Sequence, residues 1–197
     1  FALLETEPYI RPVLTRDSDV RFPLRDRMRR AESENGDLFV SIHLNASKNA
    51  KASGAEVFFL SIGAATDEAA RETARLENEA DPDFVFEEDA ELEGIPFSVS
   101  LRQSDTLRRS SHAAELLLDV LAERKLAEAR GVKQAGFAVL KSFQVPSVLV
   151  EIGFISSPRD RSQLEHPTHR SAIAEALAAG IRTWIHEYAA HRASPRP

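Results

Sequence analysis

The sequence contains no cysteine, and this absence is the first limit on its chemistry. Without thiols the chain can form neither disulfide bonds nor thiolate metal sites. A metal ion bound by this chain must therefore be held by histidine, aspartate or glutamate side chains. An oxidising compartment is compatible with the composition but is not required by it.

The sequence also lacks a basic excess and any long apolar run. It has 25 Lys and Arg against 31 Asp and Glu, which gives a formal net charge of −6. Nucleic-acid binding needs a concentrated basic face, so this charge argues against nucleic acid as a partner. No run approaches the roughly 18 apolar residues of a membrane-spanning helix, and we expect no membrane span.

An initiating Met and a signal-peptide pattern are both missing from the start of the chain. The first residues, FALLETEP, have the pattern of the end of a helix rather than of a natural beginning. We therefore expect that an N-terminal portion precedes residue 1 in the natural protein and would carry any export signal.

The chain is long enough for one sizeable core, with 197 residues of which 43% are hydrophobic, and no linker divides it. Apolar runs alternate with helical periodicities. This alternation predicts an α/β fold in one domain over 1–197, with a mostly parallel or mixed central sheet and helices on both faces. The predicted strands are 9–14, 37–47, 54–61, 136–141 and one within 145–158, and the predicted helices are 23–34, 66–80, 104–131 and 168–188.

The stretch VPSVLVEIGFISSP, residues 145–158, combines a buried-strand pattern with a single carboxylate, Glu151. A nearly unbroken apolar run is typical of a strand that is covered on both faces. Pro146 can stand only at the start of such a strand, so Glu151 falls towards its carboxyl end, where ligands bind in open α/β sheets. The competing interpretation is a structural Glu that pairs with a buried Arg or caps the next helix.

The segment DLFVSIHLNAS, residues 37–47, predicts a second buried strand with His43 at the equivalent place. A lone His after an apolar run is more often a satisfied core residue than a ligand. Two strands that each deliver an ionisable side chain at the carboxyl end nevertheless predict a shared site, with the side chains of His43 and Glu151 within about 10 Å of each other. His112, in the predicted helix 104–131, is interpreted as structural or exposed.

An acidic block lies between Glu77 and Glu93, where nine carboxylates occur without a Lys or Arg and surround the apolar triplet 84–86. The simpler interpretation is a mobile solvated loop. The alternative is a lid or docking element, because acidic side chains with embedded aromatics can cover a cationic site or meet a partner.

Four segments together are more specific than any one of them: LTRDSDVRFPLRDRMRRAE, DLFVSIHLNAS, GVKQAGFAVL and VPSVLVEIGFISSP. In this order and spacing they resemble the amidase-3 family, the zinc-dependent N-acetylmuramoyl-L-alanine amidases that cut peptidoglycan. The resemblance covers nearly the whole chain. It implies hydrolysis of the amide between N-acetylmuramic acid and the L-alanine of the stem peptide, by a periplasmic enzyme that acts in cell-wall remodelling and daughter-cell separation.

The resemblance also assigns site residues. The family holds one Zn²⁺ with two His and one Glu and uses a further Glu as catalytic base. His43 matches the second zinc His and Glu151 matches the catalytic Glu. The family's first zinc His and its zinc Glu lie upstream of the TRD segment, and the residues before Thr15 contain no His. This chain thus retains one ligand and the base, and lacks the N-terminal strand with its zinc-ligand turn.

The segment 66–109 is longer than the simplest members of the family require. It resembles the regulatory insertion of division-associated amidases of Gram-negative bacteria, in which a helix blocks the zinc until an activator protein displaces it. The hypothesis from a different class is a non-catalytic module that binds peptidoglycan or a partner with an incomplete zinc site. An unrelated α/β hydrolase is a third option, but the chain has no nucleophile elbow and no phosphate-binding glycine loop.

Overall fold

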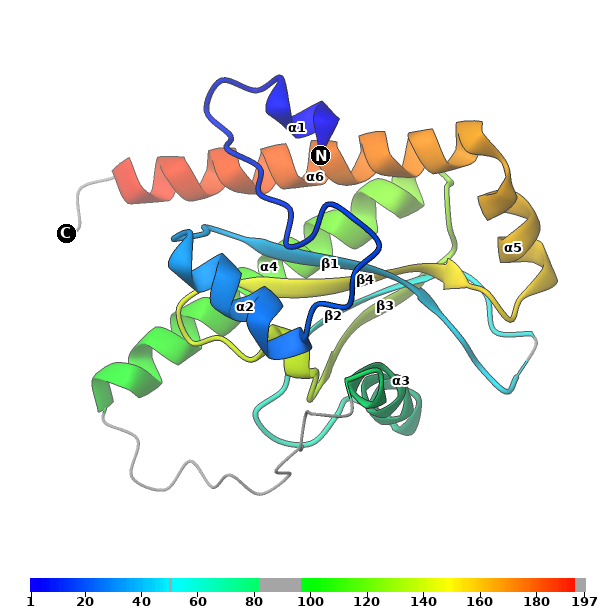
Figure 1. The fold of residues 1–197 in the computed structure, drawn as a ribbon, viewed down its shortest axis with the longest axis horizontal. Coiled ribbons are helices and arrows are strands. Elements are labelled where there is room, and N and C mark those ends of the chain that lie inside the picture. Colours follow the sequence, from blue (N-terminus) through cyan, green and yellow to red (C-terminus); the bar gives the residue numbers. More distant parts are fainter. Residues whose placement is uncertain (50, 82–96, 194–197) are drawn as a thin grey trace.

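A computed structural model describes residues 1–49, 51–81 and 97–193 of the chain. Four strands form one sheet in the order β1-β4-β2-β3 (Figure 1): β1 Phe39–Asn45, β2 Ala55–Leu60, β3 Ala129–Ala135 and β4 Ser147–Phe154. The pairs β1–β4 and β2–β3 are parallel, and β2–β4 is antiparallel. The sheet is therefore mixed, and the predicted α/β class is confirmed.

Helices cover both faces of this sheet (Figure 1). On one face lie α2 (Leu24–Ser33), α3 (Glu68–Glu79) and the short 3₁₀ helix η1 (Ala138–Leu140). The long helices α4 (Phe97–Glu123) and α6 (Pro167–Ala193) cover the other face. The short helix α1 (Ala2–Glu5) lies beside α6, and α5 (Pro158–Glu165) connects β4 to α6.

Strand β4 is the most buried strand because it lies inside the sheet and carries helices on both sides. Val148, Leu149 and Val150 are all fully buried. Leu149 joins the core on the α2 and α3 side, whereas Val148 and Val150 join the core beneath α4 and α6. This two-sided burial explains why the strand has a continuous apolar run rather than an alternating pattern.

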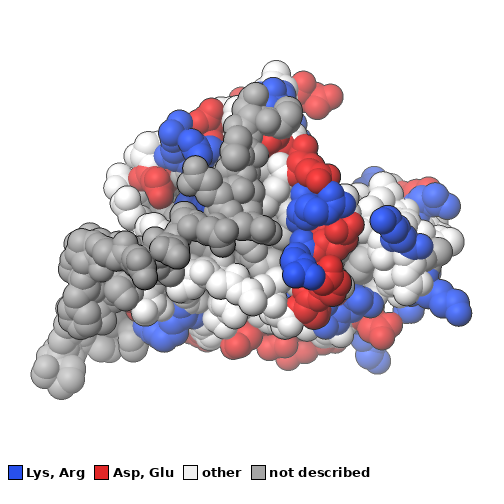
Figure 2. Space-filling model, turned by 90° about the horizontal axis from the view of Figure 1, so that it is seen from below, with Lys and Arg blue, Asp and Glu red and all other residues white. Residues whose placement is uncertain are grey.

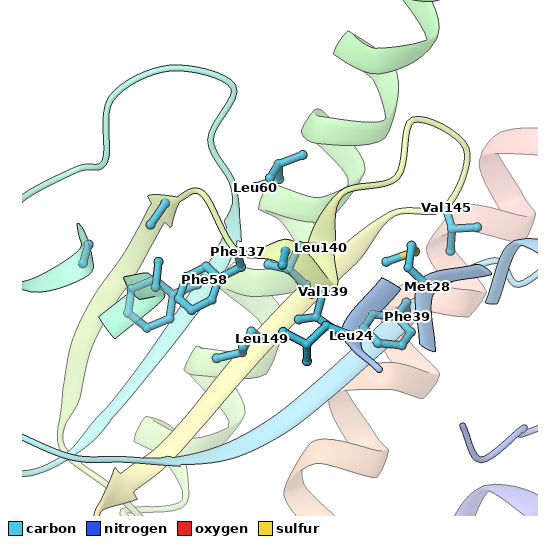
Figure 3. Close-up of a cluster of buried hydrophobic side chains, with 14 residues drawn as sticks. Leu24, Met28, Phe39, Phe58, Leu60, Phe137, Val139, Leu140, Val145 and Leu149 are labelled. Atoms are coloured by element: carbon cyan, nitrogen blue, oxygen red, sulfur yellow. The ribbon is translucent and has the colours of Figure 1, made fainter. Parts of the chain in front are cut away.

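The core on the α2 and α3 side contains two buried aromatic side chains that pack against each other (Figure 3). Phe58 of β2 and Phe137, just before η1, meet with ring centroids 5.0 Å apart at a tilted angle. Both side chains have no exposed surface. The segment after β3 is thus part of the core although it is not a strand.

That segment corrects one prediction. The apolar residues of 136–141 indicated a strand, but the strand is Ala129–Ala135 and the apolar residues belong to the core-facing turn of η1. Phe137, Val139 and Leu140 are buried without pairing in the sheet. Strand β3 was not predicted because it is an edge strand of polar sequence. Its Arg130 and Lys133 form ion pairs with the buried carboxylate of Glu56 on β2.

The strand predicted at 9–14 does not form either, and Val13 and Leu14 are exposed there. Pro8 and Pro12 flank and interrupt this segment, and proline cannot donate to a strand ladder. Helix α4 begins at Phe97 and ends at Glu123, earlier at both ends than predicted, and α5 was not predicted. The apolar triplet 84–86 lies outside the described residues.

Among the described residues, no helix combines the length and the apolar character that crossing a membrane requires.

Gly54, directly before β2, lies where the backbone requires a glycine. Its φ is +101°, and a Cβ there would meet the backbone oxygen of Glu128 at 2.3 Å. We expect Gly54→Ala to lower the free energy of unfolding by about 2 kcal/mol or more, measured by urea denaturation. Gly131→Ala is the matched control, because Gly131 also has a positive φ (+118°) but open space around it. Equal losses in the two variants would mean that the close approach at Gly54 contributes nothing.

Candidate active site

The two residues predicted to share a site lie side by side on neighbouring strands. His43 of β1 and Glu151 of β4 are direct partners in the parallel pair, so their side chains leave the sheet on the same face. Ligand atoms of His43, Glu151 and a third residue, Glu77, all lie within 4.8 Å of one another. The structure therefore brings the predicted pair together; the role of each residue stays a prediction.

Glu151 occupies the least solvated position of the group. It is fully buried, and neither of its carboxylate oxygens has a hydrogen-bond partner among the described residues. Burial raises its pKa to about 9, with the nearby carboxylates of Glu77 and Glu56 adding to the effect. A buried carboxylate without partners must either hold a proton at neutral pH or face a cation that the protein atoms do not supply.

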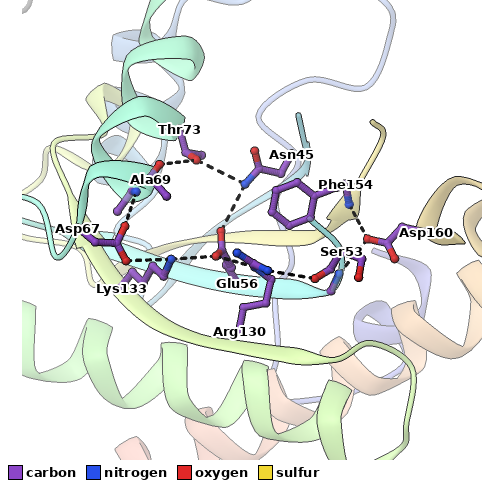
Figure 4. A network of polar contacts seen from close by, with 12 residues as sticks. Asn45, Ser53, Glu56, Asp67, Ala69, Thr73, Arg130, Lys133, Phe154 and Asp160 are labelled. Atoms are coloured by element: carbon purple, nitrogen blue, oxygen red, sulfur yellow. Dashed lines mark hydrogen bonds and ion pairs between the residues drawn. The ribbon is translucent and has the colours of Figure 1, made fainter. Parts of the chain in front are cut away.

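Glu56 provides a contrast, because it is buried almost as deeply and is fully paired (Figure 4). It lies opposite Glu151 in the antiparallel pair. Its Oε1 accepts from Nε of Arg130 and Nζ of Lys133, both at 2.9 Å, and its Oε2 accepts from Nδ2 of Asn45 at 3.4 Å. Of two facing buried carboxylates only Glu151 is left without partners, and this asymmetry marks it as the group available for chemistry.

Glu77 is the site residue that sequence reasoning missed. Its Oε2 lies 2.7 Å from Nδ1 of His43, and the other ring nitrogen, Nε2, lies 2.9 Å from Oγ of Ser41. In the sequence, Glu77 stands out only as the first residue of the acidic block. It could have been found from the helical spacing, because it extends the buried positions Ala70, Thr73 and Ala74 of α3 by three or four residues.

Helix α3 is fastened to the sheet at its first turn (Figure 4). Asp67 caps the helix by accepting from the backbone N–H of Ala70 at 2.7 Å. The same carboxylate pairs at 3.1 Å with Lys133, which also binds Glu56. The amino end of the helix is therefore tied through one ammonium group to the network beside Glu151.

Side-chain contacts also hold the carboxyl end of α3, to the segment after β3 and to the start of α2. The Asn78 side chain donates to Gly136 O at 2.9 Å and accepts from the Ala138 N–H at 2.8 Å. Asp81, buried just beyond the helix, accepts from the Leu24 N–H at 2.8 Å and pairs with Arg21 at 2.9 Å. These contacts flank Glu77 in the sequence and hold it over His43.

The outer face of α3 has a different character. Its ion pairs are local, joining Arg71 to Glu68 and Arg75 to both Glu72 and Glu79. Figure 2 shows this side of the molecule, with acidic and basic side chains alternating along one stripe. The helix thus presents solvated charges outward and a single carboxylate inward.

His112 lies away from this group. It is half exposed on α4, and its Nε2 is 2.5 Å from Oε2 of Glu187 on α6. The prediction that His112 is structural or exposed is confirmed.

A histidine and a carboxylate on neighbouring parallel strands, with a second carboxylate from the helix above them, form the kind of site that metal-dependent hydrolases build on α/β folds. The family profile for N-acetylmuramoyl-L-alanine amidases (amidase-3) matches residues 2–183 of this chain. The chain therefore belongs to this family, as its sequence motifs predicted.

Individual relatives agree with this assignment. The chain is 37% identical over 176 residues to the amidase AmiA of Escherichia coli K12, covering 88% of this chain and 60% of AmiA. It is 33% identical over 184 residues to AmiC of E. coli O6:H1, covering 93% of this chain and 44% of AmiC. The chain thus spans about half the length of these curated relatives.

Solved structures show the same fold. The amidase AmiC2 of Nostoc punctiforme superposes with a TM-score of 0.64 at 26% identity, covering 94% of this chain and 77% of that one. An amidase from Clostridium difficile 630 gives a TM-score of 0.66 at 22% identity, covering 92% of this chain and 75% of that one.

The raised pKa of Glu151 makes the stability of the metal-free chain depend on pH. Between the ordinary glutamate pKa near 4.5 and the folded value of about 9, the folded state binds one proton more than the unfolded state. The stability that protonated Glu151 contributes is therefore present in full below its unfolded pKa near 4.5. It is lost as the pH rises through its folded pKa of about 9. We expect urea denaturation to show that unfolding of the metal-free chain becomes easier between pH 5 and pH 9, by on the order of a few kcal/mol.

Glu151→Gln is the control for this experiment, because glutamine keeps the shape of the side chain and does not titrate. The difference in unfolding free energy between the chain and this variant isolates the contribution of one carboxyl group. A difference that is flat from pH 5 to pH 9 would show that the Glu151 carboxyl titrates alike in the folded and unfolded states.

Proposed function

We propose that this domain hydrolyses peptidoglycan at the amide bond between N-acetylmuramic acid and the L-alanine of the stem peptide. The observation that carries the proposal is a buried carboxylate without partners, Glu151, beside His43 and Glu77 in a chain of the amidase-3 family. The relatives AmiA and AmiC are named for this activity. Because the chain spans only part of those proteins, the activity is proposed for it.

A divalent cation fits the residues of this site, and we propose Zn²⁺. The donor set is one imidazole and carboxylates, which are groups that zinc binds in cysteine-free sites. The two unpartnered oxygens of Glu151 supply independent support, since a nearby cation would compensate their burial. In the arrangement described, His43 and Glu77 would hold the ion and Glu151 would face it. The bound cation would supply the positive charge that polarises the scissile carbonyl.

Glu151 is proposed as the general acid–base group. Amide hydrolysis requires that a proton leave the attacking water and that a proton reach the departing amine. A carboxyl group can perform both transfers when it is held rigidly and shielded from bulk water. The fully buried position in the centre of β4 provides that rigidity, and the neighbouring Glu56 is unable to compete because its oxygens are already occupied.

Glu77 is proposed as the residue that closes the site. Catalytic zinc sites keep one coordination position open for water and substrate. A carboxylate presented by α3 against His43 would occupy that position and keep basal activity low. Helix α3 falls within the segment 66–109, for which the sequence predicted a regulatory role. The carboxylate of Glu77 is therefore proposed as the group of this segment that blocks the site.

Release of the site would require a partner. We propose an activator protein that acts on the 66–109 segment and an exported, periplasmic location, where peptidoglycan is found. Complex formation occurs in this fold class, since the CwlD amidase of Clostridioides difficile has been solved with the GerS lipoprotein. Daughter-cell separation is the proposed biological context.

The roles of Glu151 and His43 can be separated in the longest natural form of the protein. Glu151→Gln should retain zinc and lose about 10²–10⁴-fold of the hydrolysis rate, the range that general acid–base catalysis contributes. His43→Ala should instead lower zinc occupancy, measured by metal analysis after dialysis. Hydrolysis is followed by dye release from labelled peptidoglycan. Unchanged turnover of Glu151→Gln would remove this residue from the mechanism, and binding of peptidoglycan by the zinc-loaded protein without dye release would favour the non-catalytic module.

The closing role of Glu77 is best tested by a point substitution. Removing residues 66–101 would also delete the buried Ala70 and Ala74, so loss of activity could reflect unfolding. Glu77→Gln should raise basal dye release by up to roughly a hundredfold, the gain expected when a site closed 99% of the time is opened. Glu72→Gln on the outer face of the same helix should leave the rate unchanged. Loss of zinc and of activity in Glu77→Gln would instead make Glu77 a ligand of the working site.

A further inference from the structure

The imidazole of His43 is held at both of its nitrogens by groups of different chemistry. Nδ1 lies 2.7 Å from the carboxylate of Glu77, and Nε2 lies 2.9 Å from the hydroxyl of Ser41. The His43 side chain is only 18% exposed, and Ser41 is buried. Water therefore competes little for either nitrogen, and these two partners decide where the imidazole carries its proton.

The two partners place different demands on the ring. An ionised carboxylate only accepts hydrogen bonds, whereas a serine hydroxyl can donate or accept. In the neutral, metal-free imidazole, the proton belongs on Nδ1 facing Glu77, and Nε2 accepts from the Ser41 hydroxyl. When a cation takes the lone pair of Nδ1, the proton must stand on Nε2, and the hydroxyl of Ser41 must accept it. A hydroxyl satisfies both states, but a carbonyl or carboxylate in its place would satisfy only the second.

We propose that Ser41 is a positioning residue of the site: its hydroxyl binds Nε2 of His43, directs Nδ1 towards Glu77 and the cation, and accommodates both tautomers of the ring. The proposal rests on the proposed function, because the cation is what requires the second tautomer. Outer partners of metal-binding histidines generally fix ring orientation in this way, and their loss typically lowers metal affinity by 10–100-fold.

The strand itself makes Ser41 suitable for this role. Ser41 and His43 are two residues apart on β1, so their side chains leave the strand on the same face. Hydrogen bonding within one strand needs no movement of other elements when the ring changes tautomer. By contrast, Glu77 reaches His43 from a separate helix, so the contact at Nδ1 can be exchanged while the contact at Nε2 is kept.

The test uses the chain with ¹⁵N-labelled histidine side chains at pH 8, where free imidazole is neutral. His43→Gln identifies the resonances of His43 among those of the six histidines. In the metal-free chain we expect the proton on Nδ1. On addition of ¹¹³Cd²⁺, a spectroscopic substitute for zinc, we expect one-bond coupling to Nδ1 and the proton on Nε2.

Three variants then decide the role of Ser41. Ser41→Ala should leave the metal-free proton on Nδ1, because Glu77 still accepts it, but should shift the Nε2 resonance by removing its hydrogen bond and weaken the affinity for Cd²⁺ 10–100-fold. Ser41→Thr keeps the hydroxyl on a residue suited to strands and should restore both. Ser61→Ala, which removes a hydroxyl bonded to Ala64 O in the loop after β2, is the matched control and should change neither. Thermal unfolding of each variant verifies that the fold is kept.

The proposal is overturned if Ser41→Ala leaves both the Nε2 resonance and the affinity as in the unmodified chain. It is also overturned if affinity falls without a change at the ring nitrogens and Ser41→Thr fails to restore it, since that pattern describes a structural role alone. Absence of any Cd²⁺ coupling at His43 in the unmodified chain would count against the proposed metal site, while the Nε2 resonance of the metal-free chain still decides whether Ser41 binds and orients the ring.

Discussion

A carboxyl group buried without a partner in the central strand is the feature on which the site depends. Glu151 could be tolerated there only if it were neutral or faced a cation, because an isolated buried charge costs far more than a domain of this size can offset. Evolution of a stable core alone would favour an apolar residue at this position. Its presence therefore points to chemistry rather than to folding.

The unpaired carboxyl group of Glu151 lies beside a network of paired charges. Glu56 is neutralised by Arg130 and Lys133, and Lys133 reaches on to Asp67 at the start of α3. One connected network therefore fixes the strand next to Glu151 and also the helix that presents Glu77. Since buried networks of this kind are stable only when every member is satisfied, displacement of α3 would disturb the polar surroundings of Glu151 as well.

The anchoring of α3 bears on the proposed closure of the site by this helix. A lid attached by its two ends alone would make few contacts with the domain, and the entropy gained on opening would favour its release. Helix α3 instead has buried residues in the core and separate side-chain anchors at both ends, through Asp67, Asn78 and Asp81. The activator proposed above would need to compensate the loss of these contacts in order to displace α3.

The sequence by itself determined the α/β class, the family, and the two strands that carry His43 and Glu151, because a long apolar run with one ionisable residue near its carboxyl end is typical of a buried strand that borders a site. Local pattern also located α2, α3 and α6. It failed at 136–141, where apolar residues fill the core from a turn, and at the polar edge strand β3, whose charged residues pair with Glu56 across the sheet.

Only the tertiary structure decided which of the described carboxylates of α3 joins the site. Glu77 and Glu79 are separated by one residue, yet one faces His43 and the other pairs with Arg75 on the outer surface. The same holds for the contrast between Glu56 and Glu151, which are both buried but differ in their partners. Burial follows largely from the local pattern of apolar residues, whereas hydrogen-bond and charge partners come from segments distant in sequence and are set only when the elements pack.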